Sequence, residues 1–314
     1  MRVIVTGASG FLGHNVLLRS PKSWRITALY HRTAGLEAFV ARHSLSHVTP
    51  VRCDLLSADD VASVATSMGG RADAALYLAA NGDPALSAKH PRWDLESNTT
   101  ALVNFLEHCP VDHLVFTSSG AVYDGLTGPV TPQTPVSPTL PYAISKLASE
   151  QYIRFFSERR QSPASFVIVR FFGAYGPYEA PRKITTRWLR ALTAGQREFT
   201  IRGDGKNLID FMYIDDAVDG YLALLSARGQ SVTVDFASGA PISIDAVVRA
   251  MAHALNVEVT VMHEGMVPEY IEFRTVDTTM RDRFNVVPRI GFEDGFKRLA
   301  HFFEHDPDGA ATPA

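Results

Sequence analysis

The sequence predicts an α/β protein whose core is a doubly wound parallel sheet. Short runs rich in β-branched residues alternate with amphipathic stretches through the first half of the chain, and a glycine-rich segment directly follows the first run. Strands and helices that alternate at this pitch form βαβ units, in which the strands lie parallel and helices cover both faces of the sheet. An apolar content of 46% over 314 residues suffices for one large domain or two interlocked ones.

The expected elements can be placed by residue number. Strands are expected at 3–6, 25–30, 48–52, 74–78, 113–118 and 166–171, with a later one at 233–237. Helical patterns lie between them, and further helices are expected near 184–192 and from about Asp215. After residue 171, Gly173, Gly176 and Pro177 mark a loop at which a second, smaller region begins.

Charge and cysteine content exclude several kinds of partner. The net charge of −3 at pH 7 provides no basic surface, so neither nucleic acid nor an anionic membrane is expected as a partner. Cys53 and Cys109 are too few for a disulfide framework or a tetrahedral thiolate metal site, and no metal is predicted. The N-terminal apolar run is too short for a signal peptide. We therefore expect a protein of the reducing cytoplasm.

The glycine-rich segment has the spacing of a dinucleotide-binding loop. The first strand runs into the segment 6–13 and then into a helix. Gly7 permits a tight turn, Gly10 lets the backbone approach a pyrophosphate at the helix N-terminus, and Gly13 lets helix and strand pack closely. The alternative is a set of ordinary turn glycines. The predicted cofactor contacts of this loop are Gly7, Ser9, Gly10, Phe11, Leu12 and Gly13.

The end of the second strand lacks the carboxylate that usually holds the ribose of NAD. The chain has Tyr30, His31 and Arg32 there, and no acidic residue precedes Glu37. A guanidinium can pair with the 2′-phosphate of NADP and stack on adenine. His31 and Arg32 are therefore predicted to bind the cofactor, and NADP is favoured over NAD. The alternative is that Arg32 is a solvated residue after the strand.

Two further strand ends carry candidate binding residues. Asp54-Leu55 follows the third strand and Leu78-Ala79-Ala80-Asn81 follows the fourth, at the carboxyl edge of the sheet where ligands bind. We assign Asn81 to the substrate and the others to the cofactor. Alternatively, Asp54 is a loop residue ahead of the capping box Ser57-Ala58-Asp59-Asp60.

Ser119, Tyr142 and Lys146 form the strongest candidate catalytic group. Tyr142 and Lys146 are four residues apart, so a helix places them on one face, where the ammonium favours the phenolate and lowers the tyrosine pKa. A phenol tuned in this way exchanges a proton near neutral pH. Ser119 ends the fifth strand, and its hydroxyl and that of Ser118 are predicted to contact the substrate. Taken singly, Tyr142 would be an ordinary half-buried aromatic residue and Lys146 a solvated lysine.

With these residues in view, the chain resembles the extended short-chain dehydrogenase/reductase family, and in particular its nucleotide-sugar epimerase and dehydratase branch. The resemblance extends over nearly the whole chain. It is carried by the glycine loop, Asp54-Leu55, the Asn98 helix at 95–106, Ser119, the Tyr142 and Lys146 pair, and the segments 170–177, 203–205 and 213–216.

The resemblance implies a Rossmann-type cofactor domain and a smaller C-terminal α/β region that binds the substrate. The cofactor domain would comprise 1–171 plus about 212–240, the substrate region 172–211 plus 241–304, and a flexible tail 305–314. NAD or NADP is the implied cofactor, with Asn98, Tyr142 and Lys146 among its contacts, and a sugar or nucleotide sugar is the implied substrate. A homodimer is also implied, formed through helices near 94–108 and 143–157.

Several positions depart from the family pattern. Family dehydratases have an acid directly after the serine or threonine, whereas this chain has Gly120 and Ala121, which disfavours a dehydratase. The usual substrate asparagine is Gly173, which we keep as a candidate contact. One arginine that holds nucleotide phosphate is Ile209 here, and a second is missing from the segment 263–273. The possible replacements are Arg182, Lys183, Arg187 and Arg202, of which Lys183 is assigned to the substrate. The alternative, favoured for each of the four taken singly, is a solvated surface residue.

The expected function is epimerisation of a sugar or nucleotide sugar through transient oxidation to a ketone. Tyr142 would act as acid and base, Lys146 would hold the cofactor ribose, and Ser119 would steady the substrate oxygen. The alternative is an NADPH-dependent ketoreductase that releases its product, which Arg32 favours. A remote alternative is a non-catalytic dinucleotide sensor, although such proteins typically lose the tyrosine or the lysine.

Overall fold

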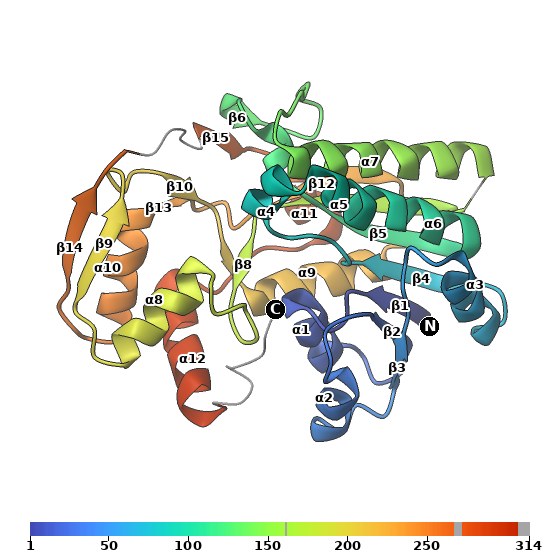
Figure 1. Ribbon diagram of the computed structural model, residues 1–314, viewed down its shortest axis with the longest axis horizontal. Helices are drawn as coiled ribbons and strands as arrows, with labels where there is room; N and C mark the ends of the chain where they lie inside the picture. The colour runs from blue at the N-terminus through green and yellow to red at the C-terminus, as the bar shows by residue number, and fades with distance from the viewer. Residues whose placement is uncertain (161, 267–271, 307–314) are drawn as a thin grey trace.

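The central sheet of the protein has seven strands in the order β12-β7-β5-β4-β1-β2-β3, and all of its pairings are parallel. The computed structural model in Figure 1 describes residues 1–160, 162–266 and 272–306. The strands of the sheet are β1 (Arg2–Thr6), β2 (Arg25–Tyr30), β3 (Val48–Arg52), β4 (Ala72–Tyr77), β5 (Val111–Ser119), β7 (Ser165–Phe171) and β12 (Val232–Phe236). The predicted doubly wound parallel fold is confirmed.

The strand order reverses at β1, and this reversal positions a ligand crevice. Val3 of β1 lies opposite Ile26 of β2 on one side and Ala74 of β4 on the other. The chain therefore leaves β1 in one direction, builds β2 and β3, and crosses back to build β4 and β5. Loops that leave β1 and β4 diverge at such a point and open a crevice at the carboxyl edge of the sheet.

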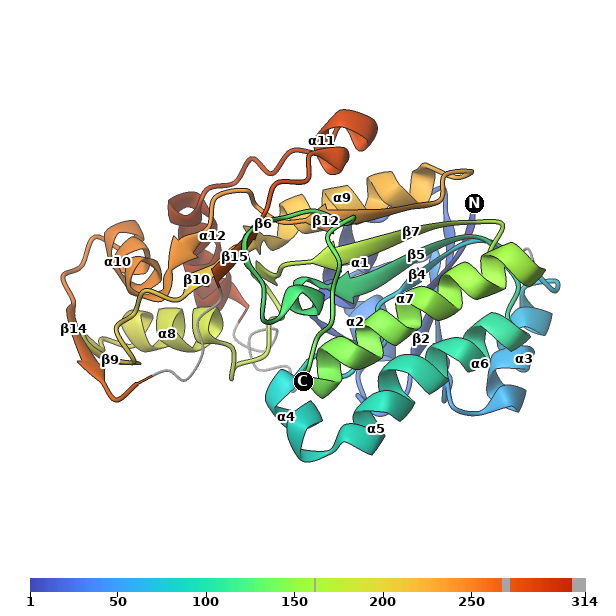
Figure 2. The ribbon, with the colours of Figure 1, turned by 90° about the horizontal axis from the view of Figure 1, so that it is seen from above.

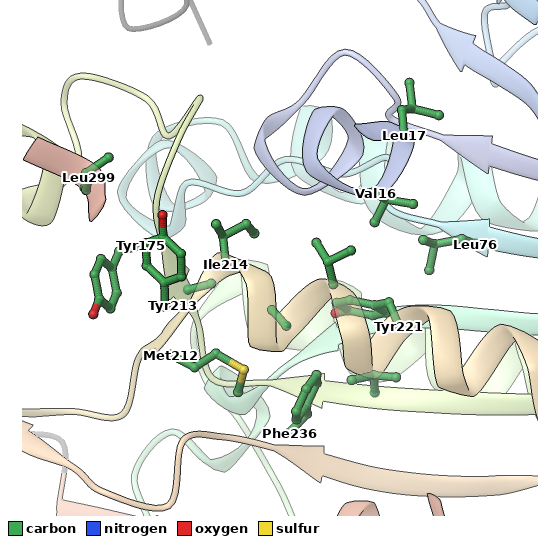
Figure 3. Packing of buried hydrophobic residues seen from close by; sticks show 14 of the residues in the cluster. Val16, Leu17, Leu76, Tyr175, Met212, Tyr213, Ile214, Tyr221, Phe236 and Leu299 are labelled. Atoms are coloured by element: carbon green, nitrogen blue, oxygen red, sulfur yellow. The ribbon is translucent and has the colours of Figure 1, made fainter. Parts of the chain in front are cut away.

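Helices cover both faces of the sheet (Figure 2). One face carries α1 (Phe11–Arg19), α2 (Leu36–Arg42) and α9 (Ile214–Ser226), and the other carries α3 (Ala58–Ser67), α6 (Ala101–His108) and α7 (Pro141–Arg160). Successive residues of a strand point to opposite faces. Val3 and Leu76 accordingly pack in the core under α1 and α9, whereas Ile4 and Tyr77 pack in the core under α3, α6 and α7. Figure 3 shows Leu76 beside Val16 of α1 and Tyr221 of α9.

Short elements near the crevice connect β4, β5 and α7. They are α4 (Pro84–Lys89), α5 (Pro91–Leu95), the π-helix η1 (Glu96–Thr100), the 3₁₀-helix η2 (Gly120–Tyr123) and β6 (Thr127–Val130). The single helix expected at 95–106 is therefore interrupted: a π-turn separates α5 from α6. A π-turn inserts an extra residue into the helical repeat and is frequent at functional sites.

A smaller group of elements lies beyond the carboxyl edge of the sheet. Its strands are β8 (Ala174–Tyr175), β9 (Glu198–Arg202), β10 (Leu208–Ile209), β11 (Met212–Tyr213), β13 (Ile242–Ser243), β14 (Thr260–Glu264) and β15 (Glu272–Thr275). Its helices are α8 (Ile184–Thr193), α10 (Ile244–Ala254) and α12 (Phe292–His305), whereas α11 (Thr279–Phe284) packs on β12 and α9 of the main sheet. Helices α8, α10 and α12 pack on one another, and β9 pairs in parallel with β14.

The predicted strands agree with the observed ones to within two residues at either end, and β2 and β3 agree residue for residue. The expected tail at 305–314 is not observed at its start, because His305 still closes α12, and 307–314 lies outside the described residues. The division into two domains stays a prediction. In the part of the chain that the structure describes, no helix is both long and apolar enough to cross a membrane.

Candidate active site

The loop after β1 brings the backbone against the crevice, and two of its glycines are required by geometry. Gly7 has a φ of +63°, and a Cβ there would lie 2.8 Å from the backbone nitrogen of Ala79. A Cβ at Gly13 would lie 2.5 Å from the carbonyl oxygen of Ala8, so α1 packs directly on the loop. Gly10 caps α1. The N-terminus of α1, with its free N–H groups, therefore adjoins the crevice and suits a pyrophosphate.

A cavity of about 310 Å³ opens at the carboxyl edge of β1, β2, β3 and β4. The predicted residues that line it are Gly7, Ser9, His31, Arg32, Asp54, Leu55, Ala79, Ala80 and Asn81. The predicted cofactor residues outside its lining are Gly10, Phe11, Leu12, Gly13, Leu78, Asn98, Tyr142 and Lys146. The cavity thus gathers the ends of four strands, as expected for the adenine, ribose and phosphate parts of a dinucleotide.

Sequence reasoning missed one wall of this cavity. Trp93 of α5 and Glu96 and Ser97 of η1 line it opposite the strand ends. The resemblance indicates this turn only through Asn98, and an apolar pattern read at the ordinary helical repeat does not show the π-turn that brings its neighbours to the cavity. Cys53 and Tyr30 also line the cavity, and both could have been found as immediate neighbours of predicted residues.

Cationic and aromatic groups stand where a ribose carboxylate is usual. His31 and Arg32 line the cavity, and Nε2 of His31 lies 3.7 Å from Oδ2 of Asp54. Glu37 lies outside the lining, hydrogen-bonded by the hydroxyl of Tyr30. The carboxylates in the described lining come from other elements than β2.

The structure agrees in part with both interpretations of Asp54, as a cofactor contact and as a loop residue before the capping box. Ser57 caps α3, with its Oγ accepting from the backbone nitrogen of Asp60 at 3.2 Å. Asp54 precedes this capping box and turns the loop by accepting from the backbone nitrogen of Leu56 at 3.0 Å. Asp54 nevertheless lines the cavity, so a structural role and a cofactor contact are compatible.

The first turns of α7 place Tyr142 and Lys146 beside the end of β5. The helix begins at Pro141, a position where the missing N–H of proline costs nothing. Lys146 is 3% exposed; its Nζ donates to the carbonyl oxygen of Thr117 at 2.9 Å and lies 6.0 Å from the centre of the Tyr142 ring. The side chain of Ser119 lies close enough to the Tyr142 phenol to lower its pKa. The structure therefore brings the three predicted catalytic residues together.

The predicted lowering of the Tyr142 pKa by Lys146 is wrong. Burial raises the pKa of the Tyr142 phenol, and the hydrogen bond with Ser119 offsets only part of this effect. Burial also lowers the pKa of the Lys146 ammonium to about 8. The spacing argument counted the attraction between groups four residues apart, but it omitted the loss of solvation that both groups suffer between α7 and β5.

Ser118 is misassigned as a substrate contact. Its side chain is turned into the interior, where Oγ donates to Oε1 of Glu150 at 2.7 Å, and the residue is 2% exposed. Neighbouring residues of a strand point to opposite faces, so Ser118 and Ser119 cannot both face the crevice.

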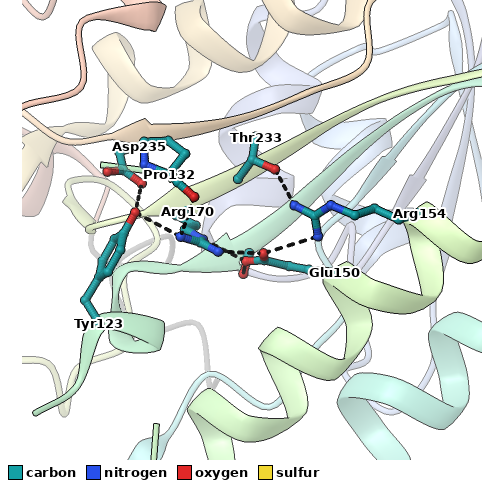
Figure 4. A network of polar contacts seen from close by, with 8 residues as sticks. Tyr123, Pro132, Glu150, Arg154, Arg170, Thr233 and Asp235 are labelled. Atoms are coloured by element: carbon teal, nitrogen blue, oxygen red, sulfur yellow. Dashed lines mark hydrogen bonds and ion pairs between the residues drawn. The ribbon is translucent and has the colours of Figure 1, made fainter. Parts of the chain in front are cut away.

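Glu150, the partner of Ser118, belongs to a buried polar network that Figure 4 shows. Glu150 is fully buried and accepts two hydrogen bonds from Arg170, at 3.1 and 3.0 Å. Arg170 also donates to the hydroxyl of Tyr123 at 3.0 Å, and this hydroxyl donates to Oδ1 of Asp235 at 2.8 Å. Burial raises the pKa of Asp235 to about 6. The network ties α7, β7, η2 and β12 together.

Asn81 and Asn98 bind each other rather than pointing freely into the crevice. The backbone nitrogen of Asn81 donates to Oδ1 of Asn98 at 2.7 Å, and its Nδ2 donates to Oδ1 of Asp94, also at 2.7 Å. The Asn98 side chain is consumed in the same cluster, where it donates to Asp94 at 3.0 Å. Both side chains therefore have partners within the protein, and the predicted contacts of Asn98 with the cofactor and of Asn81 with the substrate stay predictions.

Two glycines explain departures from the family pattern. A Cβ at Gly120 would lie 3.2 Å from the ring of Phe172, which crowds the position where dehydratases carry an acid. Gly173 has a φ of +133°, and a Cβ there would lie 2.5 Å from the ring of Phe211. Phe211 thus fills the space of the usual asparagine, and Gly173 offers only backbone to a substrate.

The loop before α8 contacts the loop before α4. Nζ of Lys183 donates to the carbonyl oxygen of Gly82 at 3.5 Å, and Arg182 lies 3.6 Å from Asp83. Lys183, a predicted substrate contact, thereby lies beside Gly82, the residue after the cavity-lining Asn81.

A second cavity, of about 270 Å³, lies between α8, β9 and the start of α10. Its lining includes Arg187 and Arg202, together with Trp188 and Ile201. Arg182 and Lys183 are outside this lining. Two of the four candidate phosphate-binding cations therefore share one cavity.

Comparison with known proteins agrees with this arrangement. The sequence profile of the NAD dependent epimerase/dehydratase family matches residues 3–235. A Bacillus subtilis protein described as an uncharacterized UDP-glucose epimerase is 30% identical over 265 residues, which cover 77% of this chain and 79% of that protein. A UDP-glucose 4-epimerase of Mycolicibacterium smegmatis is 26% identical, with 97% of this chain and 99% of that protein covered.

Solved structures show the same fold. The UDP-glucose 4-epimerase of Thermotoga maritima, solved with UDP-glucose, superposes with a TM-score of 0.86 at 18% identity, over 98% of this chain and 100% of that one. The UDP-glucuronic acid 4-epimerase of Bacillus cereus, solved with UDP-glucuronic acid and NAD, gives 0.84 at 22% identity, over 97% and 99%. The chain belongs to the NAD dependent epimerase/dehydratase family and is an enzyme of the extended short-chain dehydrogenase/reductase type.

Proposed function

We propose that the protein epimerises a nucleotide sugar at a carbinol carbon through a transient ketone. Tyr142 takes the proton of the sugar hydroxyl while Ser119 hydrogen-bonds to the same oxygen, and the carbinol hydrogen leaves as hydride. An oxidised NAD or NADP held by the cavity at the carboxyl edge of the sheet would supply the hydride acceptor. The ketone then presents its other face, hydride returns to the carbon, and Tyr142 returns the proton. No net oxidation results.

The meeting of Tyr142, Ser119 and Lys146 is the observation that carries this proposal. Because the Ser119 side chain reaches the Tyr142 phenol, one substrate oxygen can contact both hydroxyls. Nζ of the buried Lys146 lies 6.0 Å from the centre of the Tyr142 ring, so its charge would offset part of the burial that raises the pKa of the phenol.

The second cavity supports a substrate that is linked to a nucleotide diphosphate. Arg187 and Arg202 line it, and within the described residues neither forms an ion pair. Guanidinium groups bind phosphate oxygens in pairs of charge-assisted hydrogen bonds. These two arginines are proposed to replace the phosphate arginine that is Ile209 in this chain. The UDP-sugars bound in the solved relatives are consistent with this assignment.

One observation favours a second candidate function, an NADPH-consuming ketoreductase. Arg32 lines the first cavity where a ribose carboxylate would select NAD. The cofactor in the Bacillus cereus complex is NAD. The preference for NADP therefore rests on Arg32 alone, and NAD is the cofactor that the family supports.

Cofactor absorbance during turnover separates the two functions. The protein is incubated with UDP-glucose, UDP-glucuronic acid or UDP-N-acetylglucosamine and either cofactor, and the sugar is analysed by NMR. Epimerisation gives the 4-epimer with no net change in reduced nicotinamide, whereas reduction of the corresponding 4-keto sugars consumes NADPH one for one. Failure to produce either outcome with all three sugars would contradict the proposal.

A further inference from the structure

Asp94, on α5, is a fully buried carboxylate beneath the candidate catalytic residues. We infer that Asp94 is a positioning residue for the reaction, and that its negative charge keeps Lys146 protonated beside Tyr142. This inference rests on the function proposed above. It assigns to Asp94 no contact with substrate or cofactor, because the residue acts through Lys146 and through the first turns of α7.

Three side-chain hydrogen bonds hold Asp94 in place. Oδ1 accepts from Nδ2 of Asn81 at 2.7 Å and from Nδ2 of Asn98 at 3.0 Å, and Oδ2 lies 2.7 Å from Oγ of Ser145. The two amides can only donate, whereas the hydroxyl of Ser145 can donate or accept. A carboxylate buried in this way is retained only when donors or a countercharge compensate its lost solvation.

The same contacts hold the catalytic turn of α7 in place. Ser145 lies between Tyr142 and Lys146 in sequence, and its Oγ is 2.7 Å from Oδ2 of Asp94 and 3.0 Å from the carbonyl oxygen of Tyr142. Oγ1 of Thr99 donates to the carbonyl oxygen of Ser145 at 2.8 Å. Asp94 and its neighbours in η1 therefore anchor the turn that carries both catalytic side chains.

The charge of Asp94 acts on Lys146, whose charged form is disfavoured by burial. Burial lowers the pKa of Lys146 to about 8, and the strongest opposing effect is the charge of Asp94, followed by that of Glu150. Glu150 is already neutralised by its two hydrogen bonds with Arg170 of β7. Among the described residues, the side-chain hydrogen-bond partners of Asp94 are the uncharged Asn81, Asn98 and Ser145, so Lys146 is the positive charge that we pair with it.

The other groups that face Lys146 leave this assignment unchanged. From β5, the carbonyl oxygen of Thr117 accepts from Nζ at 2.9 Å, and the ring of Phe116 lies 5.2 Å away. From α7 itself, Tyr142 is uncharged until it gives up its proton, and the charge of Asp94 also raises the pKa of this phenol. Loss of the Asp94 charge would therefore lower the pKa of Lys146, and the lysine would become neutral at a lower pH.

The variant Asp94→Asn tests the charge while it preserves the shape. The remaining oxygen can still accept from Asn81 and Asn98, and the new amide can donate to Ser145, whose hydroxyl can turn to the carbonyl oxygen of Tyr142. Because activity requires protonated Lys146, kcat/KM falls as pH rises through the lysine pKa. We expect this alkaline limb to move to lower pH by about one unit or more in the variant, with a much smaller loss of activity at the acidic end.

Two parallel variants separate charge from structure and from the proposed function. Ser145→Ala removes one hydrogen bond of Asp94 but no charge, so it should lower activity without moving the alkaline limb. If the alkaline fall of kcat/KM occurs at the same pH in Asp94→Asn as in the wild type, the inference is overturned. Tyr142→Phe is measured alongside: if it stays fully active, the proposed function itself falls, whereas an inactive Tyr142→Phe with an unmoved limb removes only the role of Asp94.

A measurement on the unaltered protein covers the case in which Asp94→Asn fails to fold, as judged by its thermal melt. Carbon-13 NMR of labelled protein follows the side-chain carboxyl of Asp94 and the ε-carbon of Lys146 through a pH titration. We expect an ionised Asp94 and a protonated Lys146 at neutral pH. Either a protonated Asp94 or a neutral Lys146 under these conditions would overturn the inference.

Discussion

Tyr142 and Lys146 are shifted in opposite directions for the same reason. Burial raises the pKa of the phenol and lowers that of the ammonium to about 8, so each side chain by itself prefers its neutral form. A phenolate and an ammonium that form together attract each other strongly where water is scarce. At the scale of the residue, the ease of proton transfer therefore depends on the charges around Tyr142 and Lys146 as well as on the phenol itself.

Replacement of the Tyr142 hydroxyl tests the chemistry at this scale. Tyr142→Phe should lower kcat by about 10²–10⁴-fold, the usual contribution of a general acid and base. Cofactor affinity, measured by calorimetry, should change little, since the lost hydroxyl acts on the substrate. The matched control is Tyr152→Phe, at an exposed tyrosine further along α7. Similar losses in both variants would show that the effect is structural.

Arg32 permits a separate test of cofactor choice. Arg32→Asp should raise KM for NADP by about tenfold or more relative to that for NAD, because a charge-assisted contact to the 2′-phosphate is replaced by repulsion. Arg52→Asp is a suitable control, since Arg52 ends β3 outside the cavity lining. Equal changes for the two cofactors in Arg32→Asp would contradict the assignment.

The sequence identified side chains better than it identified their partners. Spacing alone indicated Tyr142, Lys146 and Ser119, because a helical repeat and a strand end fix where such residues lie. It could not show that Ser118 is satisfied by Glu150, since that bond joins residues far apart in the chain. For the same reason the cluster around Asp94 escaped notice.

At the scale of the element, α7 owes part of its position to a buried ion pair. Glu150 and Arg170 are 0% and 4% exposed at their side chains, with 3.0 Å between Oε2 and Nη2. Glu150→Gln would leave the guanidinium buried without a countercharge. The free energy of unfolding should fall by about 3–5 kcal/mol, as measured by urea denaturation.

The control for this change lies on the same helix. Glu158 is exposed, so Glu158→Gln should alter the free energy of unfolding by less than about 0.5 kcal/mol. A Glu150→Gln protein as stable as the Glu158→Gln protein would mean that water or another group compensates the arginine.

Elements with a strong periodic pattern were predicted well, and the exceptions have a physical cause. Buried strands such as β2 and β3 show dense β-branched runs with clear ends. The π-turn at Glu96–Thr100 leaves the apolar pattern almost intact, so one helix was expected where α5, η1 and α6 occur. Two-residue strands such as β8 and β10 are too short to have any period.

At the scale of the whole molecule, exposed apolar side chains on α5 and α7 support the predicted homodimer. Leu95 is 48% exposed, and Ile144, Tyr152 and Phe155 of α7 are 47%, 44% and 48% exposed. The spacing of the three α7 residues places them along one side of the helix. We propose that this side meets its copy in a second subunit, because apolar rings left in water favour association.

A single charge on this surface tests the dimer. Phe155→Glu should convert a dimer to a monomer in sedimentation equilibrium at concentrations where the wild type is dimeric. Val287→Glu, at a 47% exposed valine outside α5 and α7, should leave the oligomeric state unchanged. A wild-type protein that sediments as a monomer at all concentrations would end the proposal.

The return of β12 to the edge of the sheet has a consequence for engineering. The chain completes α8 and β9 before it adds β12 alongside β7, and Asp235 of β12 then binds Tyr123 at 2.8 Å. A chimaera that replaces everything after β7 as one cassette would also replace β12, the outermost strand of the sheet, and with it the hydrogen-bond partner of Tyr123. Exchange of specificity between relatives is therefore best confined to grafts of the loop before α8 and of β9, with β12 left unchanged.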